Sequence, residues 1–197
     1  MFINCPYDEK YKPLFFAIIY LCELYSYDPI FAACDESSGD RMSNIIDCIN
    51  ESKYSIHDIS KTKSKEPHFN MPFELGMYYM HINEHDKTKK LLILEGEKHK
   101  SDKTLSDLSG LEVKCHSNEI EGVFNCIRPF FNQVGIKNKK SYHRLFLEYM
   151  AECLAEIKDR AEENGYDNYL ELSPLDFKSY VEEYIELKTN KESKSDE

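Results

Sequence analysis

Short apolar runs alternate with helical patterns five times over the first 135 residues of the chain. The apolar runs span residues 2–5, 30–34, 54–59, 91–94 and 111–115. The segments between and after them have patterns typical of helices, over residues 13–25, 40–50, 72–81, 101–108 and 119–131. This alternation predicts a parallel sheet with helices on both faces, because each parallel connection crosses the sheet through a helix.

The fold predicted from this alternation is α/β and flavodoxin-like, with a five-stranded parallel sheet. Right-handed crossovers leave few strand orders, and we expect the order 2-1-3-4-5. Ligands in such folds bind beyond the carboxyl ends of the strands. Candidate binding residues are therefore expected where the runs end, at residues 4–7, 34–36, 57–60 and 95–97.

The rest of the chain predicts additional C-terminal helices. Residues 142–163 carry apolar side chains at helical spacing, and a second helix begins at Ser173-Pro174 and runs to about Leu187. We therefore expect an α/β domain over 1–137, a helical appendix over 138–188 and a charged tail over 189–197. The apolar stripe of 142–163 packs on its own domain or offers a surface for assembly.

Composition narrows the classes of function. The chain has 25 Lys and Arg against 36 Asp and Glu, a net charge of −11, which argues against binding to duplex nucleic acid. No apolar run is long enough to span a membrane, and the first residues do not resemble a signal peptide. The seven cysteines are widely spaced without a CxxC motif. Reduced thiols in a cytoplasmic protein are therefore expected.

Several familiar catalytic motifs are absent from the sequence. The first apolar run is followed by Asn4-Cys5-Pro6-Tyr7-Asp8 in place of a glycine-rich phosphate loop, which argues against a Walker NTPase and an ordinary dinucleotide-binding domain. Neither GxSxG nor HExxH occurs. His81 and His85 share helical spacing without the accompanying acid, so no metal site is expected.

Two acidic residues lie at the expected binding edge. Asp58 is near the end of the third apolar run, and Glu74 follows Pro72 in the first turn of the next helix. Each also has a purely structural interpretation. An acid in a first helical turn is favoured by the helix dipole, and a strand-end aspartate is often satisfied by local amides.

Arg41 opens the second predicted helix and is the best candidate for a phosphate contact. A guanidinium pairs two phosphate oxygens, and the helix N-terminus beside it also favours an anion. The alternative is a surface ion pair with Asp40 or Glu36.

Three stretches of the sequence resemble a family of bacterial TIR-like proteins. They are Phe2–Asp8 (FINCPYD), Tyr54–Ser60 (YSIHDIS) and Phe69–Gly76 (FNMPFELG). That family is similar to the TIR domains that cleave NAD and to the nucleoside 2-deoxyribosyltransferases. In both groups a glutamate after the third strand acts on the anomeric carbon of a ribosyl unit, and its position matches Glu74.

The resemblance implies a nucleotide N-glycosidase, with NAD as substrate, nicotinamide as product, Glu74 as the catalytic carboxylate and no resident cofactor. Cleavage of such a bond passes through an oxocarbenium-like centre that a carboxylate stabilises. Asp58 is expected to bind ribose hydroxyls or the base. Asn4 and Tyr7 are expected to hold the ribose or stack on a ring, unless they serve turn chemistry and packing. Asn70 lies on the approach to Glu74.

The resemblance also implies a bacterial antiphage role and activation by assembly, as a homo-oligomer or with a partner. Two other classes of function remain open. A nucleotide-signal sensor would bind in the same crevice without turnover, and a TIR-type assembly adaptor would need no chemistry there. Glu74→Gln separates them, because it abolishes catalysis while preserving the shape and hydrogen bonding that a sensor needs.

Overall fold

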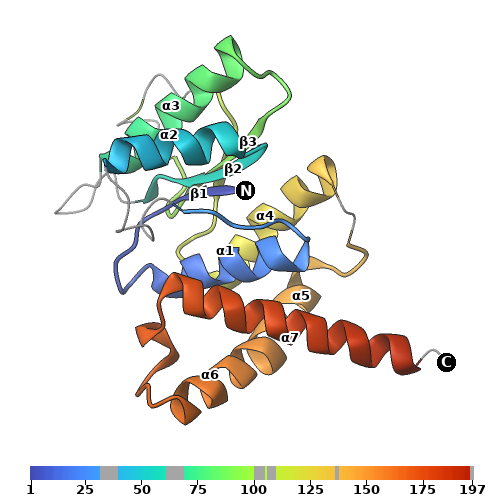
Figure 1. Cartoon of the computed structure of the whole chain (residues 1–197). Coiled ribbons are helices and arrows are strands. Elements are labelled where there is room, and N and C mark those ends of the chain that lie inside the picture. The colour runs from blue at the N-terminus through green and yellow to red at the C-terminus, as the bar shows by residue number, and fades with distance from the viewer. Residues whose placement is uncertain (32–39, 61–68, 100–104, 106–109, 136–137, 196–197) are drawn as a thin grey trace.

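The computed structural model describes residues 1–31, 40–60, 69–99, 105, 110–135 and 138–195 (Figure 1). The strands are β1 (Phe2–Asn4), β2 (Tyr54–Asp58), β3 (Lys90–Glu95) and β4 (Val113–Cys115). The helices of the α/β region are α1 (Lys12–Leu24), α2 (Arg41–Glu51), α3 (Asn70–Glu84) and α4 (Ile120–Val134). The C-terminal part comprises α5 (Tyr142–Glu148), η5 (Tyr149–Cys153), α6 (Leu154–Glu163), η6 (Tyr169–Glu171) and α7 (Pro174–Ser195).

The sheet is parallel throughout, with the strand order β1-β2-β3-β4. Its register pairs Ile3 with Ile56, and Ile56 with Leu92. This order is the one expected for the first, third, fourth and fifth apolar runs. The carboxyl ends of all four strands therefore lie along one edge, as the sequence predicted.

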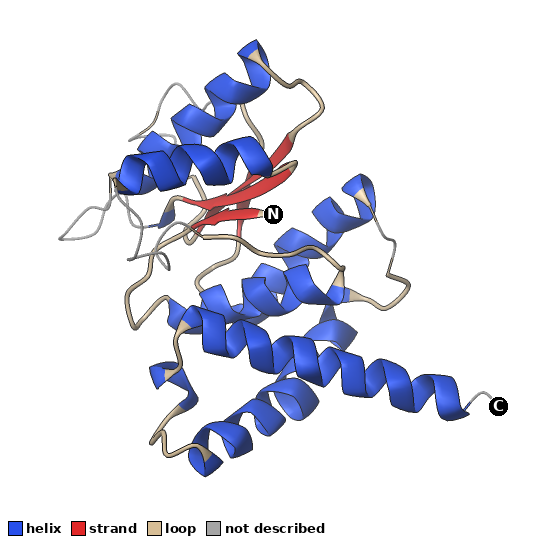
Figure 2. Cartoon of the chain, viewed as in Figure 1, coloured by secondary structure: helices blue, strands red, loops and turns tan. Residues whose placement is uncertain are grey.

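Side chains of successive strand residues point to opposite faces, and each face has its own helices. On one face Phe2 packs with Tyr78 of α3 and with Ile45 and Ile49 of α2. On the other face, Ile3 belongs to the large core that includes α1 and α4. Figure 2 shows the strands between these two helical layers. The prediction of a sheet covered on both faces is confirmed.

The prediction of a five-stranded sheet is wrong for the described residues, which form four strands. The run expected at 30–34 contributes one isolated parallel bridge, between Ile30 and Phe2. Ile30 donates to the carbonyl of Met1 at 2.8 Å and accepts from the amide of Ile3 at 2.9 Å. Pro29 before it has no N–H to extend a ladder, and residues 32–34 lie outside the described part.

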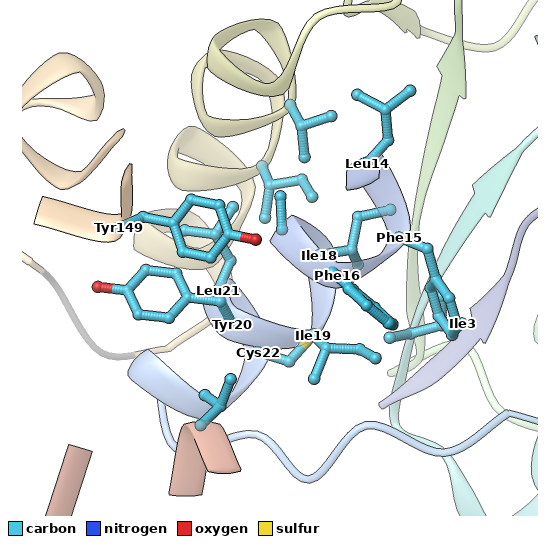
Figure 3. Packing of buried hydrophobic residues seen from close by; sticks show 14 of the residues in the cluster. Ile3, Leu14, Phe15, Phe16, Ile18, Ile19, Tyr20, Leu21, Cys22 and Tyr149 are labelled. Atoms are coloured by element: carbon cyan, nitrogen blue, oxygen red, sulfur yellow. The ribbon is translucent and has the colours of Figure 1, made fainter. Parts of the chain in front are cut away.

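Helix α1 forms the centre of the main core. Every residue from Leu14 to Cys22 is buried, so the helix is covered on all sides (Figure 3). A helix that is apolar all round must lie in the interior. Here the sheet and α4 cover part of α1, and the C-terminal helices cover the rest.

The C-terminal helices pack directly on this core. The ring of Phe177 in α7 stacks on that of Phe16, with ring centroids 3.8 Å apart. The ring centroids of Tyr149 and Tyr20 are 4.8 Å apart. The predicted helix over 142–163 is present and contains one π-helical turn, η5. Most of its apolar stripe is buried in the chain's own core, with Leu145 and Ile157 fully inaccessible, whereas Tyr142 and Met150 are exposed. The packing interpretation therefore holds for the buried part of the stripe.

Other boundaries agree with the sequence to within a few residues. The side chain of Asp40 caps α2 by accepting from the amide of Met42 at 3.1 Å. Helix α7 continues to Ser195, through most of the segment expected to be a charged tail. The helix expected over 101–108 lies almost wholly outside the described residues. Among the described helices, none has the length and apolar character needed to cross a bilayer.

Candidate functional site

The most polar part of the interior lies at the carboxyl ends of β1 and β2. Asn4 and His57 are register partners, and Asp58 follows His57. All three side chains are buried, with at most 1% of their surface exposed. Buried polar groups are costly unless they are paired, so the partners of each show what the site is built to do.

The alternation of side chains along β2 divides these groups into two clusters. Asp58 points to the face of α1 and, with Tyr11, Ser60 and His116, forms what we call the Asp58 cluster. His57 points to the face of α2 and α3. Asn4, His57 and Met71 are joined by hydrogen bonds on this face. We call these three residues, together with Glu74, which is buried three positions after Met71 on α3, the Glu74 cluster.

Every acceptor position of the Asp58 carboxylate is occupied. Its Oδ2 accepts from the Tyr11 hydroxyl at 2.5 Å and from Nε2 of His116 at 2.8 Å. Its Oδ1 accepts from the amide of Ser60 at 2.8 Å and from the Ser60 hydroxyl. Two oxygens offer about four lone-pair sites. This geometry favours the structural interpretation of Asp58 over contact with ribose.

The hydrogen bonds also fix the tautomer of His116. Its Nδ1 accepts from the amide of Asn118 at 3.1 Å, so the proton lies on Nε2 and is directed at Asp58. The Ser60 oxygen lies 3.1 Å from the same protonated nitrogen. A general base needs a free nitrogen facing the serine. Ser60, His116 and Asp58 are the three residue types of a hydrolase triad, but the histidine nitrogen near the serine is protonated, so they do not have the geometry of a triad.

In the Glu74 cluster, Asn4 links two strands and a helix. Its Nδ2 donates to Nδ1 of His57 and to the carbonyl of Met71, both at 2.9 Å. Asn4 therefore fixes the first turn of α3, which contains Met71, against the ends of β1 and β2. The Oδ1 of Asn4 has no hydrogen-bond partner among the described residues. Its role in the fold is thus structural, with one buried acceptor left open.

His57 is neutral in this environment. Burial lowers the pKa of its imidazole from 6.5 to about 3. Because Nδ1 accepts from Asn4, the single proton is on Nε2, and that atom is buried with no partner in the described part of the chain. The ring lies between Phe2 and Tyr78, with centroids 5.7 and 5.4 Å away. His57 is therefore held in place by its neighbours, and its low pKa makes it a poor base.

Glu74 occupies a position on α3 where an apolar residue would be ordinary. The buried stripe of α3 consists of Met71, Glu74, Leu75 and Tyr78, and Glu74 is 5% exposed. No hydrogen bond to its carboxylate is present among the described residues. Burial raises the pKa of Glu74 from 4.5 to about 7, and the charge of Arg41 opposes that rise. Because α3 begins at Asn70, two residues before Pro72, Glu74 is the fifth residue of the helix, and the prediction that it lies in the first turn is wrong. Glu74 is a buried acid further along the helix.

Cys5 shows that the two clusters are electrostatically close. Burial raises the pKa of its thiol, and the charges of Asp58 and Glu74 raise it further. Cys5 is wholly buried beside both carboxylates and is therefore unreactive as a nucleophile.

The remaining predicted site residues lie at the periphery. Arg41 is exposed at the start of α2, where its charge acts on Glu74. Tyr7 is partly buried and packs edge-on against Phe15 at 5.2 Å, which agrees with the packing alternative. Asn70 is exposed at the first position of α3. Residues 34–36, expected at the same edge, lie outside the described part.

Two aromatic rings close to Glu74 in the sequence are exposed at the start of α3. Phe69 is 69% exposed and Phe73 is 56% exposed. Gly76 is also exposed, and a methyl group there would meet none of the described residues within 4 Å. The glycine is therefore not required for close packing of the helix, contrary to the usual meaning of a glycine at this position.

Sequence reasoning missed Tyr11 and His116 as partners of Asp58. His116 directly follows the last predicted strand, so the rule of carboxyl ends brings it to the same edge. The described residues contain no group of three or more potential metal ligands.

Comparison with known proteins gives no further guide to this site. No protein-family model matches the chain, and no match is found among curated proteins or solved structures. The candidate site is therefore described from its own geometry.

Proposed function

We propose that this protein is a nucleotide N-glycosidase with a TIR-like fold, in which the carboxylate of Glu74 acts on the anomeric carbon of a ribosyl unit. NAD is the substrate we infer first. The observation that carries the proposal is the burial of Glu74, without a hydrogen-bond partner among the described residues, at the carboxyl edge of a parallel sheet. A buried acid with a pKa near neutrality is typical of a functional site.

The chemistry needs few groups from the protein. The C–N bond to nicotinamide breaks, and its electron pair leaves with the neutral base. The positive charge that develops on the ribosyl carbon is stabilised by the Glu74 carboxylate, and water then adds and loses a proton. A carboxylate in an apolar surrounding stabilises this charge more strongly than one in water.

The residues around Glu74 suit the other parts of a dinucleotide. The guanidinium of Arg41, at the N-terminus of α2, is placed to pair with phosphate oxygens. The exposed rings of Phe69 and Phe73 offer flat surfaces on which a base can stack. The Oδ1 of Asn4, which has no partner among the described residues, is an acceptor for a hydroxyl that enters the cluster.

A mass-spectrometric screen tests the proposal. The protein is incubated with NAD, NADP, ATP and deoxynucleosides at several protein concentrations, since we also propose activation by assembly. We expect release of nicotinamide or a free base by the wild type. Glu74→Gln should lose this activity, while the matched variant Glu84→Gln, exposed at the end of the same helix, should retain it.

The same experiment includes binding measurements, which separate the alternatives. Tight binding of one nucleotide by both wild type and Glu74→Gln, without product at any concentration, would replace the enzyme by a signal sensor. Absence of binding and of product would leave the assembly adaptor. The proposed antiphage role is tested by phage plating on cells that express wild type or Glu74→Gln.

A further inference from the structure

A second candidate site lies away from Glu74, beside β3. It is a groove of about 800 Å³ between α3 and α4 that runs toward the amino-terminal ends of the strands. Tyr79 and Ile82 line it from α3, and Pro129 and Phe130 line it from α4. Nothing in the proposed glycosidase uses this groove.

The floor of the groove includes an open strand edge. β4 pairs with β3 only from Ile93 onward, so Lys90–Leu92 has no strand partner on that side among the described residues. The carbonyl of Glu95 faces β4, because it accepts from the amide of His116 at 3.0 Å. Backbone groups alternate along a strand, so the N–H and C=O of Leu91 face the same way, into the groove.

The rim of the groove is basic, although the chain as a whole carries a charge of −11. Among the described residues that line it are Lys53, Lys87 and Lys90, and a further lysine, Lys114, pairs with the one acid, Glu112. Lys89 also borders the groove, but its Nζ donates to three carbonyls at the end of α2 and is fully engaged. An anionic occupant is therefore favoured by local charge.

We propose that this groove binds an extended acidic peptide segment of a partner protein, which adds as a short strand beside β3. Leu91 would supply the main-chain hydrogen bonds, the lysines would pair with carboxylates, and apolar side chains of the peptide would contact Phe130 and Ile82. Peptides commonly bind by adding a strand to an open sheet edge. Lysines at an edge discourage pairing with uncharged strands, so they select for an acidic one.

The test uses the full-length protein and short labelled peptides of alternating glutamate and valine. We expect binding by fluorescence anisotropy, with amide chemical-shift changes in NMR spectra that include Leu91. The same peptide with N-methylated backbone nitrogens, and one with lysine in place of glutamate, should each bind at least about tenfold more weakly. These two probes leave the protein unchanged.

A charge variant completes the experiment. The double variant Lys87→Glu/Lys90→Glu should weaken binding of the acidic peptide by about tenfold or more, while Lys191→Glu, exposed on α7, should not. Equal binding of the N-methylated and unmodified peptides would overturn strand addition. Binding of ATP or tripolyphosphate in the groove without binding of the peptide would overturn the peptide as occupant, and so would the absence of any binding.

Discussion

The two carboxylates at the carboxyl edge of the sheet, Asp58 and Glu74, are both buried, but they differ in their hydrogen-bond partners. Asp58 accepts hydrogen bonds from the side chains of Tyr11, Ser60 and His116 and from one backbone amide. Glu74, on the other face, accepts none from the described residues. A buried acid with all its partners stabilises a fold, whereas one without them costs stability.

The number of hydrogen-bond partners distinguishes a structural acid from a candidate functional acid better than burial does, because both side chains are buried. The Asp58 cluster ties β2 to the loop after β4 and to the start of α1, and leaves no acceptor for a ligand. The Glu74 carboxylate is held in an apolar stripe of α3, where burial disfavours its charged form and, among the described residues, only the charge of Arg41 opposes this effect. Costs of this kind are typical of sites kept for activity.

The largest expected effect comes from removing the Asp58 carboxylate. In Asp58→Ala, donors from Tyr11, Ser60 and His116 would be buried without an acceptor, and we expect a loss of about 3–5 kcal/mol in the free energy of unfolding. Urea unfolding measures it. The milder Tyr11→Phe removes one donor and should cost about 1 kcal/mol.

The control for this change is another aspartate in a turn. Asp86 accepts from the amide and hydroxyl of Thr88, but at the surface. Asp86→Ala should therefore destabilise the protein far less than Asp58→Ala. Equal losses would mean that the hydrogen bonds of Asp58 do not stabilise the fold, and would return Asp58 to the set of ligand-binding candidates.

The next effect concerns Glu74 and depends on pH. The folded state raises its pKa from 4.5 to about 7, so folding favours the protonated acid. The folded state is therefore penalised progressively as the pH rises from 4.5 to about 7. Glu74→Gln lacks this penalty, and its stability relative to wild type should increase by about 2–3 kcal/mol over that interval.

Urea unfolding of both proteins below pH 4.5 and above pH 7 measures the change. The comparison of the two proteins cancels the contributions of other titrating groups to the pH dependence of stability. One such group is Glu23, whose pKa is also raised to about 7. Glu84→Gln provides the baseline for an exposed glutamate on the same helix. A stability difference that does not vary with pH would show that the Glu74 carboxylate is compensated in solution, and the contrast with Asp58 would disappear.

Much of this contrast could be predicted from sequence, because it depends on local pattern. The order of the described strands follows from alternation and handedness, and Asp58 and Glu74 follow from the rule that ligands bind at carboxyl ends. The buried position of Glu74 agrees with the packed neighbour Leu75. Phe73, which also indicates packing by its apolar character, is exposed instead.

The partners of these residues could not be predicted in the same way. His116 is 58 positions from Asp58 in the sequence, and their contact depends on the register of two strands and a turn. The rule that ligands bind beyond the carboxyl ends of parallel strands predicts at which edge of the sheet a residue lies, but not on which face. The face follows from side-chain alternation along β2, which places Asp58 with Ile56 and His57 with Ser55 and so assigns the two clusters to opposite faces.

The smallest effect on stability is expected at Phe73, beside Glu74. Its ring is 56% exposed, so Phe73→Ala should change the free energy of unfolding by no more than about 0.5 kcal/mol. If the ring stacks on a base, nucleotide affinity should fall about tenfold, since such stacking contributes about 1–3 kcal/mol. Calorimetric titration of the Glu74→Gln background with NAD measures this without turnover. Met80→Ala, equally exposed further along α3, should leave affinity unchanged, and equal losses in both variants would place the nucleotide away from the start of the helix.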